Sequence, residues 1–224
     1  GLIYKLDKMN APAHLIKMID SFLKNRKFVV SVKGQESSPR DIPAGLAQGS
    51  ILSPLLYAIY TSDLKSPRNC EIGLYADDTA ILTQAKQSNT FMKRLEAALF
   101  RINEYFKKWR IKINSDKTQA ILFKFNRARR RNPTIPSMFN GTTINLKREV
   151  TYLGVILDDK LSFNAHTVSL RAKTLKAFSA IHPLLHHESK LSTRNKLILY
   201  KAMLRPKMTY AAPVWISTSA TNIN

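Results

Sequence analysis

Acidic residues and cysteines are scarce in this chain. Only 15 Asp and Glu stand against 36 Lys and Arg, which gives a formal net charge of +21. The single cysteine, Cys70, excludes an internal disulfide and fits a reducing compartment. No stretch approaches the roughly 18 uncharged apolar residues of a membrane span, and the first residues lack the apolar segment of a signal peptide. We therefore predict neither a membrane span nor secretion.

Apolar residues, by contrast, are plentiful, because 44% of the chain is hydrophobic and 224 residues can bury a sizeable core. The excess of positive charge favours a nucleic-acid partner, since Lys and Arg gain affinity by releasing the counterions condensed on phosphates. An anionic membrane surface is the alternative. It is the weaker one, because the basic residues are spread over loops and several helices instead of one amphipathic face.

Hydrophobic spacing predicts both helices and short strands. Strands are predicted over residues 28–32, with a return strand before Pro43, and over residues 144–146 and 150–157. Residues 111–123 are predicted to form a polar turn followed by a strand. Helices are predicted over residues 12–23, from Ser53 onward, from about Ser88 to 109, over 165–185, and over 192–204, where Pro206 ends the helix. The change from strands to helices places a domain boundary near residues 158–159.

Two adjacent aspartates, Asp77 and Asp78, interrupt an otherwise apolar pair of predicted strands at residues 71–83. We interpret this stretch as a hairpin with both carboxylates at its tip. Asp-Asp is a poor two-residue turn, and neighbouring like charges repel. A divalent cation would remove that repulsion. An isolated Asp-Asp is more often a solvated turn, so the surrounding motifs have to decide.

A loop with two glycines, Gly45 and Gly49, leads into the helix predicted at Ser53, with Ser53 as its cap and Pro54 at its first position. Exposed amides at such a helix start favour phosphate groups. Loops of this kind are more often structural, and no Gly-Lys-Ser/Thr follows as in a Walker A loop. Lys117, at a polar turn, either reaches a phosphate or is an ordinary exposed lysine.

Taken in order, these motifs resemble the reverse transcriptases of non-LTR retrotransposons, and most of all the jockey-type elements of insects. Residues 45–54 resemble motif B of that family, 75–78 motif C, 117–118 motif D, and 152–155 the primer-grip motif E. Residues 199–206 and 210–215 resemble its thumb-region pattern. The resemblance implies an α+β fold. Residues 1–157 would form a partial right-hand polymerase palm of antiparallel strands packed on helices, and residues 158–224 a truncated helical thumb.

The resemblance also implies an RNA-directed DNA polymerase that adds deoxynucleotides to a primer 3′-hydroxyl with two Mg²⁺ ions, or Mn²⁺ in their place. Asp77 and Asp78 would be the catalytic, metal-binding residues, with the weaker role for Asp78. The other implied contacts are Gln48, Gly49, Ser50, Tyr75 and Lys117 for nucleotide and template, Leu153 and Gly154 for the primer, and Lys124, Arg127, Arg129, Arg130 and Arg131 for backbone phosphates.

The family's third carboxylate, in motif A, and its fingers region are expected upstream of Gly1. We therefore expect a fragment that folds only partly like the parent enzyme and does not polymerise alone. The expected partners are RNA template, DNA primer, deoxynucleoside triphosphates and the N-terminal part of the same polyprotein, in a nuclear and cytoplasmic ribonucleoprotein. Ala47 replaces the usual Pro of motif B. Two alternatives remain: a non-catalytic nucleic-acid-binding remnant, and a related palm polymerase such as an intron-encoded maturase.

Overall fold

The structure is a computed structural model that describes residues 1–123, 138–139, 142–144 and 146–216. It combines helices with short, mostly antiparallel strands, which confirms the α+β class. The chain divides into two compact units, Gly1–Ile113 and Asn114–Asn224. The boundary predicted between residues 157 and 158 lies within the second unit and stays a prediction. Among the described helices, none is long and apolar enough to cross a membrane.

Three helices form the first core of unit 1: α1 (Leu2–Lys8), α2 (Ala13–Leu23) and α3 (Leu52–Thr61). Leu2 and Leu6 of α1 are buried together with Leu56 of α3, and α2 packs its apolar face against them. Pro12 directly precedes α2, because a residue without an N–H loses no hydrogen bond at a helix start. The helix predicted over residues 12–23 is confirmed, whereas α1 was not predicted.

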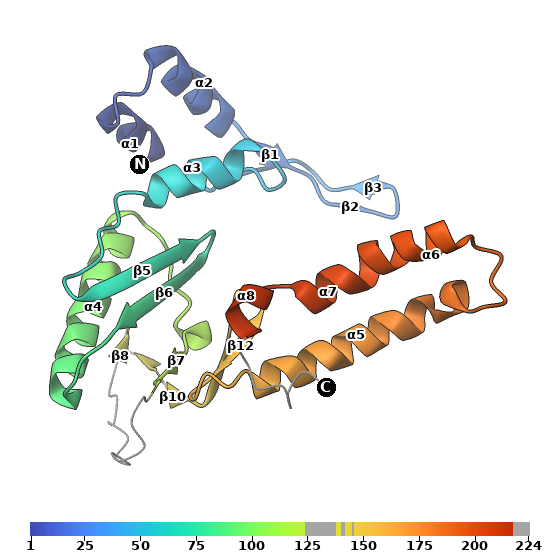
Figure 1. Ribbon diagram of the computed structural model, residues 1–224. Helices are drawn as coiled ribbons and strands as arrows, with labels where there is room; N and C mark the ends of the chain where they lie inside the picture. The colour runs from blue at the N-terminus through green and yellow to red at the C-terminus, as the bar shows by residue number, and fades with distance from the viewer. Residues whose placement is uncertain (124–137, 140–141, 145, 217–224) are drawn as a thin grey trace. The chain divides into compact units, whose positions relative to one another are not determined.

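A narrow two-stranded arm follows α2 (Figure 1). Strand β1 (Lys27–Phe28) pairs with β4 (Arg40–Asp41), and β2 (Ser31–Val32) pairs with β3 (Gln35–Glu36), all antiparallel. This confirms the predicted strand with a return strand before Pro43. Every residue of these four strands is exposed, so the arm contributes little to the core.

The second half of unit 1 is a hairpin on a long helix. Strands β5 (Cys70–Tyr75) and β6 (Asp78–Thr83) are antiparallel, and both lie against α4 (Ser88–Lys108) (Figure 1). Because side chains alternate along a strand, Cys70 shares one face of the hairpin with Ile72 and Ile81, and this is its more buried face. Helix α4 buries a stripe of four residues, as its predicted periodicity required: Ala98, Leu99, Ile102 and Phe106.

Unit 2 begins with a 3₁₀ turn, η1 (Ser115–Lys117), and short strand pairs. Strand β7 (Ala120–Ile121) pairs in parallel with β10 (Leu146–Lys147), and β8 (Met138–Phe139) pairs with β9 (Thr142–Thr143). The single strand predicted over residues 150–157 is wrong. The chain instead folds back as β11 (Glu149–Tyr152) and β12 (Val155–Asp158). Leu153 and Gly154 both take positive φ, 45° and 79°, as a type I′ turn requires.

Helices complete unit 2: α5 (Asn164–Leu185), α6 (Thr193–Leu199), a π-helical turn η2 (Tyr200–Leu204), α7 (Arg205–Thr209) and α8 (Ala212–Trp215). The Ser192 hydroxyl caps α6 at the start of the predicted helix, accepting the Asn195 N–H at 3.3 Å. Pro206 does not end the helix, contrary to the prediction. The π-helical turn widens the backbone ahead of the proline ring, where an α-helix would clash with it.

Asp158 stabilises the link between β12 and α5. It is buried, and its carboxylate accepts the N–H groups of Lys160 and Ser162 at 3.0 Å and of Phe163 at 2.6 Å, besides the Ser162 hydroxyl at 3.2 Å. Burial alone would raise the pKa of this carboxyl, but the hydrogen bonds outweigh burial and hold the pKa below its usual range. The ionised form is therefore the one that this loop needs.

We expect Asp158→Asn to lower the free energy of unfolding of unit 2 by about 2 kcal/mol at pH 7, because the amide replaces one acceptor oxygen by an NH₂ donor that faces the N–H donors of the loop. Since the folded pKa is lowered, the contribution of Asp158 is present above the unfolded pKa of about 4 and is lost as the pH falls through the folded pKa. Urea unfolding at pH 7 and pH 3 measures this. The neighbouring Asp159→Asn is the control. An equal loss from both variants would contradict the prediction.

Candidate functional site

The aspartate pair lies at the tip of the β5–β6 hairpin, but not in the predicted register. Tyr75 pairs with Asp78, so the two turn residues are Ala76 and Asp77, and Asp78 is the first residue of β6. Ala76 takes the positive φ of 49° that the turn demands. The ladder fixes this register, because a shift by one residue would turn the apolar residues of one strand to the other face.

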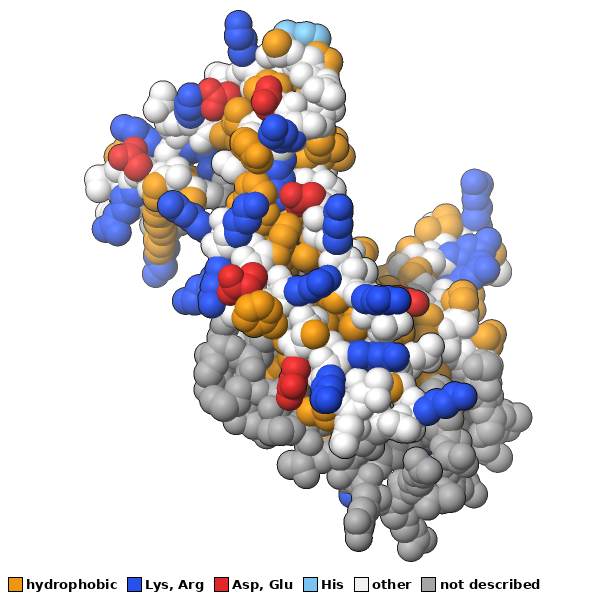
Figure 2. Space-filling model, turned by 90° about the vertical axis from the view of Figure 1, so that its left-hand side faces the viewer, with side chains coloured by type: hydrophobic (Ala, Val, Ile, Leu, Met, Phe, Trp, Pro, Cys, Tyr) orange, Lys and Arg blue, Asp and Glu red, His pale blue; other side chains and the backbone are white. Residues whose placement is uncertain are grey.

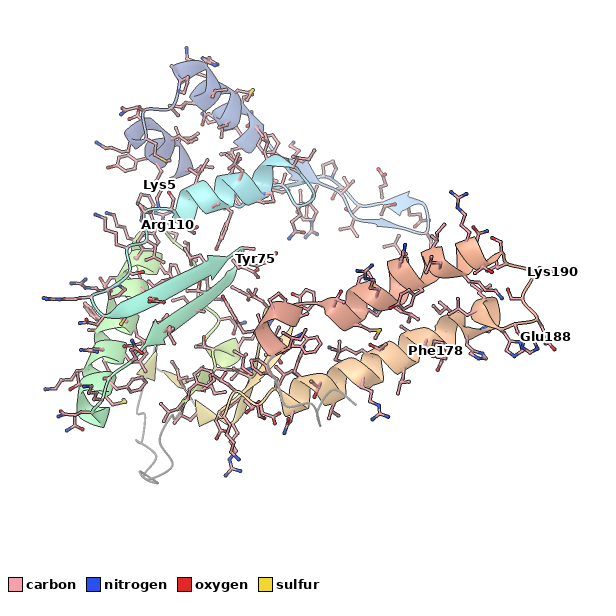
Figure 3. All side chains as sticks on the ribbon, viewed as in Figure 1. Lys5, Tyr75, Arg110, Phe178, Glu188 and Lys190 are labelled. Carbon is pink, nitrogen blue, oxygen red and sulfur yellow. The ribbon has the colours of Figure 1, made fainter. Side chains whose placement is uncertain are left out.

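The register sets the exposure of the two carboxylates. Asp78 lies beside Tyr75 on the face opposite the buried one, and Figure 3 shows Tyr75 at the end of β5. Asp77, Asp78 and Tyr75 are all exposed, and Tyr75 is 65% accessible. Among the described residues, neither carboxylate has a hydrogen-bond or ion-pair partner. Two adjacent, unengaged carboxylates fit a hard divalent cation, which prefers oxygen ligands.

Among the described residues, no third side chain joins the pair as a metal ligand. Within the part of the chain that the structure describes, no group of three or more His, Cys, Asp or Glu side chains is placed to hold a metal ion. Two carboxylates alone leave most positions around a six-coordinate cation to water or to other ligands. The two carboxylates are therefore suitable ligands for Mg²⁺ but supply only part of its coordination.

Tyr57 of α3 lies close enough to the hairpin tip to sense its charge. Burial, and secondly the negative charge of Asp77, raise the pKa of the Tyr57 hydroxyl above its usual value. Among the causes of this shift, the Asp77 charge links the acidic turn to Tyr57 on α3, the helix that follows the glycine loop. Sequence analysis did not single out Tyr57, because a helical tyrosine amid apolar residues carries no signal of its own.

The glycine loop presents the predicted residues Gln48 and Gly49 to solvent, with Ser50 half-buried. Gly49 has a φ of 84°, which favours glycine. Ser53 is not the helix cap: α3 begins at Leu52, and the Ser53 hydroxyl donates to the Ala47 carbonyl at 2.6 Å. Ser50 instead accepts the Leu52 N–H at 3.2 Å. These two hydroxyls fold the loop back on the start of α3.

Arg26, which sequence analysis missed, binds the start of the glycine loop. The Arg26 guanidinium donates to the Leu23 carbonyl at the end of α2 and to the Gly45 carbonyl at the start of the loop. It connects the three-helix core to the residues before α3. An arginine after a helix end is common in so basic a chain, so its sequence position gave no signal.

The remaining predicted residues belong to unit 2. Lys117 is exposed, and its N–H is accepted by the Asn114 side chain at 3.2 Å. Leu153 and Gly154 form the β11–β12 turn, where Leu153 is half-buried and Gly154 is exposed. The five predicted phosphate contacts lie outside the described residues: Lys124, Arg127, Arg129, Arg130 and Arg131.

Basic side chains are distributed widely over the described surface. Figure 2 shows one face on which Lys and Arg side chains are numerous and separate, with only a few Asp and Glu between them. The face shown would attract a polyanion over a broad area.

Comparison with known proteins gives this site its context. The model of the family "Reverse transcriptase (RNA-dependent DNA polymerase)" matches residues 1–157. The RNA-directed DNA polymerase from mobile element jockey of Drosophila funebris is 35% identical over 233 residues, covering 100% of this chain and 25% of that protein. The probable RNA-directed DNA polymerase from transposon X-element of Drosophila melanogaster is 30% identical, covering 96% of this chain and 24% of that protein.

The chain thus spans about a quarter of the length of these curated relatives. No solved structure matches it. The family match covers well over half of the chain and includes both the glycine loop and the acidic hairpin, which confirms the resemblance found in the sequence. The chain belongs to the reverse transcriptase family, with the polymerases of jockey-type non-LTR retrotransposons among its relatives.

Proposed function

We propose that this chain is part of an RNA-directed DNA polymerase that extends a DNA primer along an RNA template. The observation that carries the proposal is the hairpin tip, where two adjacent carboxylates are exposed and unengaged although the local sequence is unfavourable without a cation. In this assignment residues 1–157 are a partial palm, and residues 158–224 are thumb-like.

Asp77 and Asp78 would hold the divalent ions, Mg²⁺ or Mn²⁺, with Asp77 as the stronger ligand. When bound, such ions lower the pKa of a hydroxyl and stabilise negative charge on phosphate oxygens. The protein's own contribution is to keep both carboxylates exposed at the tip of a six-pair ladder, with Asp78 in the first pair and Asp77 in the turn. Tyr75, on the same face as Asp78, would contact the incoming nucleotide or template.

The other contacts bind substrate. Gln48, Gly49 and Ser50 would line the nucleotide and template pocket with exposed backbone, and Lys117 would contact the triphosphate. Leu153 and Gly154 would position the primer end. The basic surface would hold template and primer through their phosphates, which makes affinity fall steeply with salt. The remaining partner is the rest of the polyprotein, and the setting is a nuclear and cytoplasmic ribonucleoprotein.

We expect no primer extension by the 224-residue chain alone, because its carboxylate pair lacks a third ligand among the described residues. A chimera in which these residues replace the matching segment of the Drosophila funebris jockey polymerase should extend a primer on RNA. The assay is incorporation of labelled deoxynucleotide with Mg²⁺, with and without EDTA, and the unaltered jockey polymerase is the positive control.

Two outcomes would contradict this proposal. Extension by the isolated chain that Asp77→Asn abolishes would show that the pair suffices. An inactive chimera that still binds RNA and DNA, with strong salt dependence and no Mg²⁺ effect, would favour the second candidate function, a non-catalytic nucleic-acid-binding remnant. The formal net charge of +21 supports that candidate as well.

A further inference from the structure

The turn between β11 and β12 is held by a residue far along the chain. The Tyr210 hydroxyl donates to the carbonyl of Leu153 at 2.7 Å. The tyrosine ring lies against the next residue, since a Cβ placed on Gly154 would come within 3.2 Å of the ring carbon Cε1. One side chain therefore contacts both central residues of the turn.

The turn needs such support because its backbone is unfavourable. Leu153 has a φ of 45°, which is rare for a residue with a branched side chain. Gly154 has a φ of 79° and leaves the room that the tyrosine ring occupies. Without the hydroxyl, the Leu153 carbonyl would lose its hydrogen bond and the turn would relax more freely.

Tyr210 is itself fixed by the core of unit 2. The indole N–H of Trp215 donates to the Tyr210 carbonyl at 2.8 Å. Trp215 is buried with Val155 of β12 and Phe163. His166 of α5 lies beside the indole, with ring centroids 5.8 Å apart, and its Nδ1 accepts the Ile156 N–H at 3.3 Å. Strand β12 and the segment 210–215 are thus locked to the same core.

We propose that Tyr210 is a positioning residue for the primer end, acting through the Leu153–Gly154 turn. The inference rests on the proposed function, in which this turn contacts the primer. Tyr210 itself does not have to touch nucleic acid. It fixes the position of the turn and limits its motion. The exposed backbone at Gly154 would then contact a primer terminus in a single orientation.

The test uses the 224-residue chain, Tyr210→Phe, and the control Tyr200→Phe, whose hydroxyl has no hydrogen-bond partner among the described residues. Hydrogen exchange over residues 149–158 should accelerate about fivefold in Tyr210→Phe and stay unchanged over α5, because one hydrogen bond is lost locally. Tyr200→Phe should leave both regions unchanged.

The second measurement tests recognition of the primer end specifically. Fluorescence anisotropy compares an RNA template carrying a DNA primer with a recessed 3′ end and the same template covered completely by DNA. We expect wild type and Tyr200→Phe to prefer the recessed end, and Tyr210→Phe to lose that preference about fivefold. A general loss of stability would weaken both affinities alike and leave their ratio unchanged.

The outcomes separate this inference from its premise. A wild-type preference that Tyr210→Phe leaves intact would overturn the inference alone. A wild-type chain without preference for a recessed end would contradict the primer contact in the proposed function, and the inference with it. Exchange that accelerates equally in the hairpin and in α5 would show a structural role and overturn the positioning role.

Discussion

Asp77→Asn is expected to lower the primer-extension rate of the jockey chimera by about a thousandfold, and Asp78→Asn to lower it less. A thousandfold corresponds to about 4 kcal/mol of lost transition-state stabilisation, the scale on which a metal ion stabilises phosphate charge. The amide keeps the shape of the side chain but removes its negative charge. Asp77 lies in the turn itself, while Asp78 is held in the first pair of the ladder.

The measurement is single-turnover incorporation at saturating Mg²⁺, repeated with Mn²⁺. Asp20→Asn serves as the control, because this aspartate on α2 pairs with Lys24 at 2.5 Å and should leave the rate unchanged. Urea unfolding of Asp77→Asn should match wild type or exceed it slightly, since removing one of two adjacent charges relieves repulsion. Normal activity of the Asp77→Asn chimera would contradict both the assignment of Asp77 as a metal ligand and its proposed catalytic role.

The β5–β6 hairpin shows which features of the site can be predicted from the sequence alone. Alternating apolar residues predicted both strands and placed the aspartates at the tip, because a two-residue period is a local property of the chain. They could not settle which two residues form the turn. The six-pair ladder decided that, and it moved the turn from Asp77–Asp78 to Ala76–Asp77. Exposure of both carboxylates was predictable, whereas the face that Asp78 shares with Tyr75 was not.

Two other predictions from the sequence are wrong for the same reason, because contacts between distant residues decide the local structure. The strand predicted over residues 150–157 contains a hairpin, because Leu-Gly is a weak turn signal and a contact of the turn comes from the Tyr210 hydroxyl, 57 residues away. The sequence predicts a helix end at Pro206, whereas the structure continues from a π-helical turn into α7 at this proline. Local rules describe what a residue favours by itself. Contacts between distant residues decide the remaining cases.

Lys5 makes several such contacts, and we expect Lys5→Met to lower the free energy of unfolding of unit 1 by about 3 kcal/mol. Lys5 is only 4% exposed. Its ammonium donates to the Tyr60 carbonyl, to Asp63 and, at 2.8 Å, to the Tyr105 hydroxyl, and it lies 3.8 Å from the Trp109 ring centroid. Methionine keeps the apolar stem and removes every one of these interactions. Figure 3 shows Lys5 in this unit, on α1.

Lys8→Met is the matched control, because Lys8 lies on the same helix and is exposed, so its loss should cost less than about 0.5 kcal/mol. Hydrogen exchange of α1 and α4 amides as a function of urea measures the unfolding of unit 1 separately from that of unit 2. Equal effects of the two substitutions would show that the buried ammonium contributes nothing beyond its stem.

The pH dependence gives this prediction a second, independent test. Burial alone would raise the pKa of Asp63, but hydrogen bonds from Lys5 and Tyr105 and the charge of Lys5 outweigh it and lower the pKa. A lowered folded pKa means that the stabilisation is complete above the unfolded value of about 4 and is lost as the pH falls through the folded pKa. Lys5→Met removes most of this linkage. The difference in the free energy of unfolding between wild type and Lys5→Met should therefore narrow from pH 7 to pH 3, and a constant difference would show that the ion pair with Asp63 does not cause the destabilisation.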